Sequence, residues 1–122
     1  MAIRFFVSVV LMLLASGQVN AQQRWIFTGA GTRTCGQFAE AYRASPERHE
    51  AFYFAWAQGF MSGRNSVLAD NNQLIRDLAS LGMDEQQSFI RHYCNQFPLD
   101  LYYSAVIKLH NSLKQLVEPK SN

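Results

Sequence analysis

The two cysteines of this 122-residue chain, Cys35 and Cys94, constrain its fold more than any other feature of the sequence. The N-terminal segment described below predicts export, and export places thiols where they become oxidised, so the pair is expected to form a structural disulfide. Only one intramolecular pairing is possible. In the chain-entropy model, closing a loop of this length stabilises a fold by on the order of 4 kcal/mol. For one small domain this is a large share of the total stability.

Residues 1–21 have the order of a signal peptide. Arg4 precedes an apolar run over residues 5–15 that is interrupted only by Ser8, and small and polar residues then lead to Ala21. A helix that spans a membrane needs roughly 20 apolar residues, and this run is shorter. We therefore expect cleavage between Ala21 and Gln22 and a mature protein without a membrane span.

The charge of the mature part argues against a nucleic-acid partner. After Arg4 is removed, ten Lys and Arg face nine Asp and Glu, and the two signs are mixed along the chain. A nucleic-acid interface or a polybasic membrane patch would require clustered cations. The remaining length suits one domain.

Apolar residues recur at helical spacing in five segments, and no segment shows the alternation that a strand requires. Thr34 is suited to cap the first helix, and Ser45 with Pro46 to begin the second. Gly82 is expected to close the third helix in a left-handed conformation. The prediction is an all-α bundle of about five helices closed by one disulfide, with a flexible arm over 22–34 and a helical domain over 35–118. The expected helices cover residues 35–44, 46–68, 74–81, 84–97 and 99–117.

Ala55, Gly59 and Gly63 lie four residues apart in the longest predicted helix. A glycine inside a helix costs roughly 1 kcal/mol relative to alanine, so the missing side chains should serve a purpose. The expected purpose is a packing groove for another helix of the same chain. A partner's backbone or a ligand in this groove is the alternative.

The sequence offers no convergent set of acid, base and oxyanion donors, so we expect no enzymatic activity, metal or cofactor. His92 and Cys94 could suggest a thiol nucleophile with its base. However, residues two apart on a helix point in different directions, and an oxidised cysteine cannot attack a substrate. The three histidines, His49, His92 and His110, have polar neighbours and are expected to face solvent.

Two short blocks resemble the HdeA/HdeB family, which consists of small helical periplasmic proteins with one disulfide, known as acid-stress chaperones. Residues 34–38, Thr-Cys-Gly-Gln-Phe, are similar to the family's Thr-Cys-x-x-Phe block, and residues 93–98, Tyr-Cys-Asn-Gln-Phe-Pro, to its Tyr-Cys-x-x-x-Pro block. Residues 56–65 look more like a block found in HdeA-like proteins and in immunity proteins against type VI secretion amidases. Those immunity proteins usually carry a further cysteine in this region and lack the second block.

The resemblance implies a periplasmic chaperone that binds unfolding proteins through apolar surface exposed in acid. Carboxylates lose their charge as the pH falls toward 3, while Lys, Arg and His stay positive, and the resulting repulsion should loosen the bundle. The alternatives are a module that binds one specific protein, as immunity proteins do, or an envelope protein with no fixed client. The candidate partner-binding residues are Trp25, Phe52, Trp56, Phe60, Arg64 and Tyr103.

Overall fold

The computed structural model describes residues 27–116 and shows a small, mostly helical fold. The predictions for the signal peptide, for Ala21 and Gln22 and for Trp25 lie outside this range. The all-α class is confirmed, but four α-helices are present in the described part rather than about five. The elements are the 3-10 helix η1 (Gly29–Thr32), α2 (Cys35–Ala44), α3 (Pro46–Asp70), β1 (Ile75–Arg76), α4 (Met83–Gln96), α5 (Tyr102–Ser112) and β2 (Gln115–Leu116).

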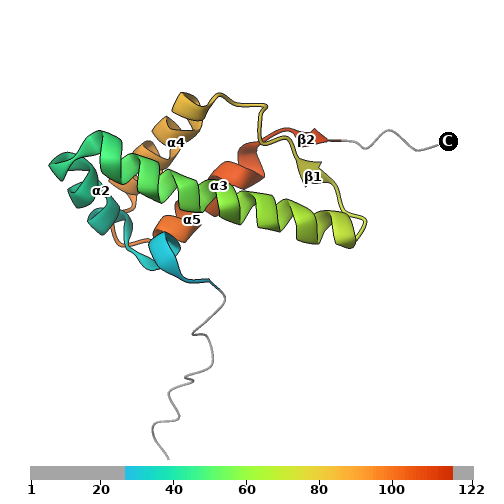
Figure 1. Cartoon of the computed structure of the whole chain (residues 1–122), viewed down its shortest axis with the longest axis horizontal. Helices are drawn as coiled ribbons and strands as arrows, with labels where there is room; N and C mark the ends of the chain where they lie inside the picture. The colour runs from blue at the N-terminus through green and yellow to red at the C-terminus, as the bar shows by residue number, and fades with distance from the viewer. Residues whose placement is uncertain (1–26, 117–122) are drawn as a thin grey trace, which may run out of the picture.

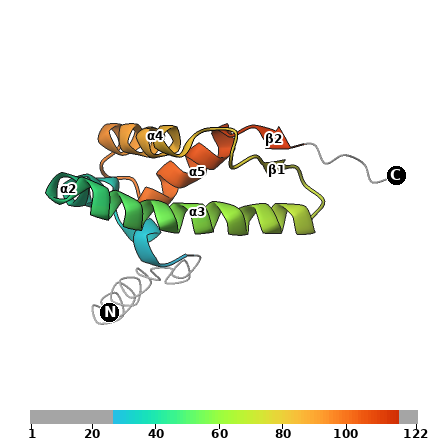
Figure 2. The same cartoon turned by 45° about the horizontal axis from the view of Figure 1, so that its top comes forward.

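Helix α5 lies between α3 and α4, as Figure 2 shows, and α2 packs at the N-terminal end of α3. The two short strands lie beside the C-terminal half of α3, away from α2 (Figure 1). Within residues 27–116, none of the helices combines the length and the apolar character needed to cross a bilayer. The buried core is apolar and gathers residues from all four helices, among them Phe38, Phe54, Met61, Ile90, Tyr102, Val106 and Leu109.

The predicted start of α2 is confirmed. The Thr34 hydroxyl accepts a hydrogen bond from the Gln37 N–H at 3.1 Å, and the Gln37 side-chain oxygen accepts one from the Thr34 N–H at 2.9 Å. This reciprocal capping box satisfies two of the N–H groups that an isolated helix would leave unpaired. The next two, from Cys35 and Gly36, donate to main-chain carbonyls of the loop between α4 and α5, at 2.7 and 2.8 Å.

The predicted disulfide is also confirmed: Cys35 at the start of α2 is bonded to Cys94 in the last turns of α4. Both cysteines are buried. The bond joins the two sequence blocks that flank the cysteines, and these blocks lie against each other, since Thr34 and Leu101 also form an isolated antiparallel bridge. The disulfide therefore closes the end of the domain at which the chain enters α2 and leaves α4.

The prediction of a helix over 74–81 was wrong. Ile75 and Arg76 instead pair in antiparallel register with Leu116 and Gln115. The local preference for a helix is overridden because the side-chain amide of Asn65 on α3 pairs with the main-chain groups of Arg76. Gly82 has a φ of −61° and is the N-cap of α4, so the predicted left-handed helix end was wrong as well.

The last predicted helix was too long at both ends. Residues 99–101 belong to the loop before α5, because their main chain is engaged by α2 and by the bridge to Thr34. Beyond Ser112, Leu113 is buried and the chain leaves the helix to form β2.

The groove predicted over Ala55, Gly59 and Gly63 does not pack against another helix. All three residues are exposed, and a Cβ atom added to either glycine would meet nothing within 4 Å. Only one face of α3 is covered, and its buried residues are Tyr53, Phe54, Ala57 and Met61. The stripe lies on the opposite face, in solvent.

Residues 27–34 are held by α3 and do not behave as the predicted flexible arm. The Trp56 indole N–H donates to the Thr28 carbonyl oxygen at 2.7 Å, and Ala30 and Gly31 are buried. A Cβ atom on Gly31 would lie only 2.2 Å from the Trp56 ring, so this close approach requires glycine. The ordered domain thus begins before Cys35.

Candidate functional site

Three of the six predicted partner-binding residues form one aromatic cluster. The rings of Trp56 and Phe60 stack with their centroids 5.1 Å apart, and Phe60 meets Tyr103 edge to face at 5.3 Å. Phe27 stacks on Tyr103 at 4.1 Å and meets Trp56 at 6.2 Å. Trp56, Phe60 and Tyr103 are half-buried. Much of their apolar surface is therefore buried in the contacts that hold the N-terminal segment against α3 and α5.

The other predicted partner-binding residues are placed elsewhere. Phe52 is 65% exposed and its ring contacts that of Tyr53 at 5.8 Å. Arg64 lies further along α3, where its guanidinium donates to Asn111 on α5. Phe52 is a free apolar contact point, whereas Arg64 belongs to a polar region described below.

The loop between α4 and α5 carries an apolar surface that the sequence analysis missed. Phe97 is half exposed, Leu99 is 90% exposed and Leu101 is also exposed. The main chain of this loop faces α2, because the carbonyls of Pro98 and Asp100 accept from its first N–H groups. The apolar side chains of this loop are therefore exposed to solvent. The run Phe-Pro-Leu-Asp-Leu directly after α4 is the signal for this surface in the sequence.

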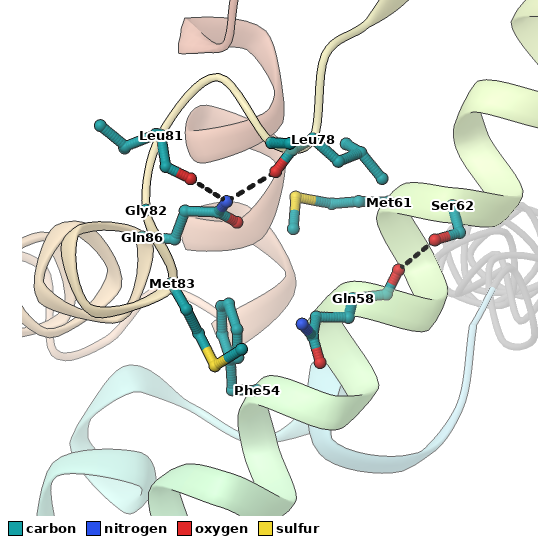
Figure 3. A pocket seen from close by; sticks show the side chains of 10 residues that line it. Phe54, Gln58, Met61, Ser62, Leu78, Leu81, Gly82, Met83 and Gln86 are labelled. Carbon is teal, nitrogen blue, oxygen red and sulfur yellow. Dashed lines mark hydrogen bonds between the residues drawn. The ribbon is translucent and has the colours of Figure 1, made fainter.

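A pocket of about 360 Å³ opens between α3 and the start of α4. Figure 3 shows the side chains of Phe54, Met61 and Met83 around it. The Gln86 amide nitrogen donates to the carbonyls of Leu78 and Leu81, at 2.8 and 2.7 Å, and so fixes the loop that forms one wall (Figure 3). The pocket is a preformed, mainly apolar hollow.

A polar centre lies where α3, β1 and α5 meet. Asn65 on α3 donates to the Arg76 carbonyl at 2.8 Å and accepts from the Arg76 N–H at 3.1 Å, which fixes the orientation of its amide. The same Asn65 oxygen lies 3.0 Å from Nε2 of His110 on α5. Because this oxygen can only accept, Nε2 carries the proton of the neutral imidazole.

His110 is completely buried, so the expectation that it faces solvent was wrong. Its position, four residues after Val106 and three before Leu113, puts it on the buried face of α5, and this spacing was the signal for its burial. Its second ring nitrogen, Nδ1, has no hydrogen-bond partner among residues 27–116. A proton on Nδ1 would therefore be buried without an acceptor.

The surroundings of His110 oppose its positive form. Burial, followed by the charges of Arg64 and Arg76, lowers the pKa of His110 from 6.5 to about 4. Desolvation disfavours the imidazolium, and two nearby cations add repulsion. His110 is thus neutral at pH 7 and becomes charged only in acid. The charge then forms where α3, β1 and α5 pack together.

Arg64 and Arg76 also line a pocket of about 440 Å³ on the surface above this centre. Its remaining lining is provided by Leu68, Asn72, Gln73, Leu74, His110, Asn111 and Gln115. No acidic residue is among them. This is a cationic, amide-rich pocket.

Comparisons with protein-family models, with curated proteins and with solved structures find no match to this chain. The function is therefore argued from the geometry above together with the resemblance of the two cysteine blocks. The disulfide is compatible with an exported protein in an oxidising compartment.

Proposed function

We propose that this protein is an exported, non-enzymatic chaperone of the HdeA/HdeB kind, which loosens in acid and binds unfolding proteins through apolar surface. The observation that carries the proposal is the buried, neutral His110 beside Arg64 and Arg76. A buried neutral histidine makes the stability of the folded state fall in the acidic range in which such a chaperone would act.

The direction of the pH effect follows from linkage. The folded protein holds His110 at a pKa of about 4, whereas the imidazole of an unfolded chain titrates near 6.5. Between these values the unfolded chain binds the proton more tightly, so stability is lost as the pH falls from about 6.5 to about 4. The shift corresponds to about 3 kcal/mol, which is large against a total of about 5–15 kcal/mol.

The position of His110 indicates which contacts would loosen. Protonation places a charge between α5, α3 and β1, far from the disulfide that joins α2 to α4. The strand end should therefore open first while the disulfide limits the extent of unfolding. Opening of α3 from α5 would uncover the core side chains Met61 and Leu109.

Apolar surface is also present before any opening. Leu99 and its neighbours in the 97–101 loop are exposed, and the pocket beside Met83 is preformed. Exposed apolar side chains of this kind suit non-specific contact with unfolded segments. The proposal assigns the first contact with a client to the 97–101 loop.

Light scattering of a client that aggregates after acid treatment tests the proposal. The client is taken to pH 3 and neutralised, with and without the oxidised protein. We expect suppression of aggregation after acid treatment, and a weaker effect for Leu99→Ser. Val67→Ser is the matched control, because Val67 is also exposed but lies on the outer face of α3. Absence of suppression would count against the chaperone function.

A second candidate is an immunity-type module that binds one specific protein at neutral pH. The observation that favours it is the preformed cationic pocket with Arg64 and Arg76, since arginine is enriched among residues that dominate binding energies. In a chaperone triggered through His110, Arg64→Gln should change the pH at which suppression begins without abolishing suppression. A specific binder that uses this pocket would instead lose most of its affinity.

A further inference from the structure

The pocket bounded by Arg64 and Arg76 is lined by two positive charges, and its lining residues carry no negative charge. The ion pair found within residues 27–116 joins Arg91 to Glu50, in another part of the fold. Asp77 follows Arg76 directly, but its carboxylate accepts the Ala79 N–H at 2.9 Å. Two guanidinium groups therefore line one pocket in which the described residues provide no carboxylate.

Each arginine is held in place by one side-chain hydrogen bond to another residue of the described range 27–116. Arg64 donates one N–H to the Asn111 side chain at 3.2 Å, and Arg76 donates one to the Leu113 carbonyl at 3.0 Å. A guanidinium has five N–H donors in a planar fork that matches a carboxylate. The two single hydrogen bonds orient the side chains and leave further donors for a ligand.

The surroundings of the arginines add neutral hydrogen-bonding groups. The amide side chains of Asn72, Gln73, Asn111 and Gln115 line the same pocket. A volume of about 440 Å³ falls in the range of small-molecule sites, about 300–1,000 Å³. Such a lining suits a ligand rich in oxygen atoms and carrying negative charge.

The charges of the two arginines also reach a group behind the pocket. His110 is fully buried against this region and is among the residues that line the pocket. The charges of Arg64 and Arg76 both act on it. The two guanidinium groups therefore disfavour any further positive charge in this region, and a bound anion would offset their repulsion.

We propose that the pocket between Arg64 and Arg76 is a binding site for a carboxylate, provided either by a small free anion or by an acidic side chain of a partner protein. This site does not require the chaperone function, because it is a polar surface that is already present at neutral pH. The two are linked, because Arg64 and Arg76 also act on His110. The carboxylate would take bidentate hydrogen bonds from one guanidinium and charge-assisted contacts from the other.

The test uses His110 as an internal reporter. Its imidazole resonances are followed by NMR in the purified, oxidised protein, during titration with malonate or citrate at constant ionic strength. An anion between the arginines should raise the pKa of His110 by about one unit, since it offsets their repulsion. A short peptide rich in Glu, titrated in parallel, distinguishes a free anion from a protein side chain as the source of the carboxylate.

Two variants decide whether the arginines are responsible. Arg64→Gln should abolish the carboxylate-dependent shift, and Arg64→Lys should keep part of it because the charge remains. Arg48→Gln is the matched control, since Arg48 is an exposed cation near the start of α3. A saturable shift that depends on Arg64 supports the site. A shift equal to that of sodium chloride, or one unaffected by Arg64→Gln, overturns it.

Discussion

Nε2 of His110 lies 3.0 Å from the side-chain oxygen of Asn65, and this contact connects α5 to the α3–β1 junction. The same oxygen already accepts the Arg76 N–H, so the neutral imidazole must donate through Nε2. The histidine is therefore part of the packing between three elements, with its free nitrogen buried. Its protonation state and the integrity of that packing are coupled.

The first prediction concerns the titration of this histidine. His110 should titrate near pH 4, because burial and two arginines disfavour its charged form. An NMR titration that resolves His49, His92 and His110 measures this directly. A His110 midpoint near 6.5 in the folded protein would contradict the assigned burial.

The second prediction concerns acid stability. His110→Gln should reduce the loss of stability between pH 7 and pH 4 by up to about 3 kcal/mol, because glutamine can still donate to Asn65 but does not titrate. Denaturant unfolding at both pH values measures the difference. His92→Gln, at an exposed position, should leave the pH dependence unchanged. Equal pH dependence in the His110 variant and the parent protein would remove His110 as a source of acid sensitivity.

The third prediction separates glycines that the fold needs from those it does not. Gly59→Ala and Gly63→Ala should each raise the stability by about 0.5–1 kcal/mol, since both lie inside a helix with open space beside them. Gly31→Ala should instead destabilise the fold, because its Cβ would collide with the Trp56 ring. Thermal unfolding measures all three. Destabilisation by Gly59→Ala would mean that the stripe is covered in the folded protein.

The fourth prediction concerns the disulfide. Replacement of Cys35 and Cys94 by alanine should cost about 2–5 kcal/mol, because the unfolded chain is no longer constrained across the long loop. Denaturant unfolding at pH 7 measures this loss. If the disulfide limits acid opening, the variant should also fail to refold fully after exposure to pH 3, while the parent protein recovers.

The features that could be predicted from sequence are those set by local chemistry. The capping pair of Thr34 and Gln37, Pro46 at the start of α3 and the two cysteines each carry a signal that neighbouring residues do not override. Residues 74–81 had helical spacing too. Their strand depends on Asn65 and on Leu116, which are distant in sequence, so local spacing could not predict it.

The candidate site was less predictable for the same reason. Trp56, Phe60 and Tyr103 were predicted to bind a partner, but how much of each ring remains exposed depends on Phe27 and the η1 segment. Arg64 was identified without Arg76, because their pairing requires the β1 strand. His110 was assigned to the surface since its neighbours in sequence are polar, whereas its position on the helix face buries it.

The pH at which chaperone activity begins shows whether His110 controls that activity. Client aggregation is measured by light scattering after incubation at a series of pH values from 7 to 3, with the parent protein and with His110→Gln. Suppression by the parent protein should begin between about pH 6.5 and pH 4, and the variant should require a lower pH. Suppression that is absent throughout, or that begins at the same pH in both proteins, would contradict it.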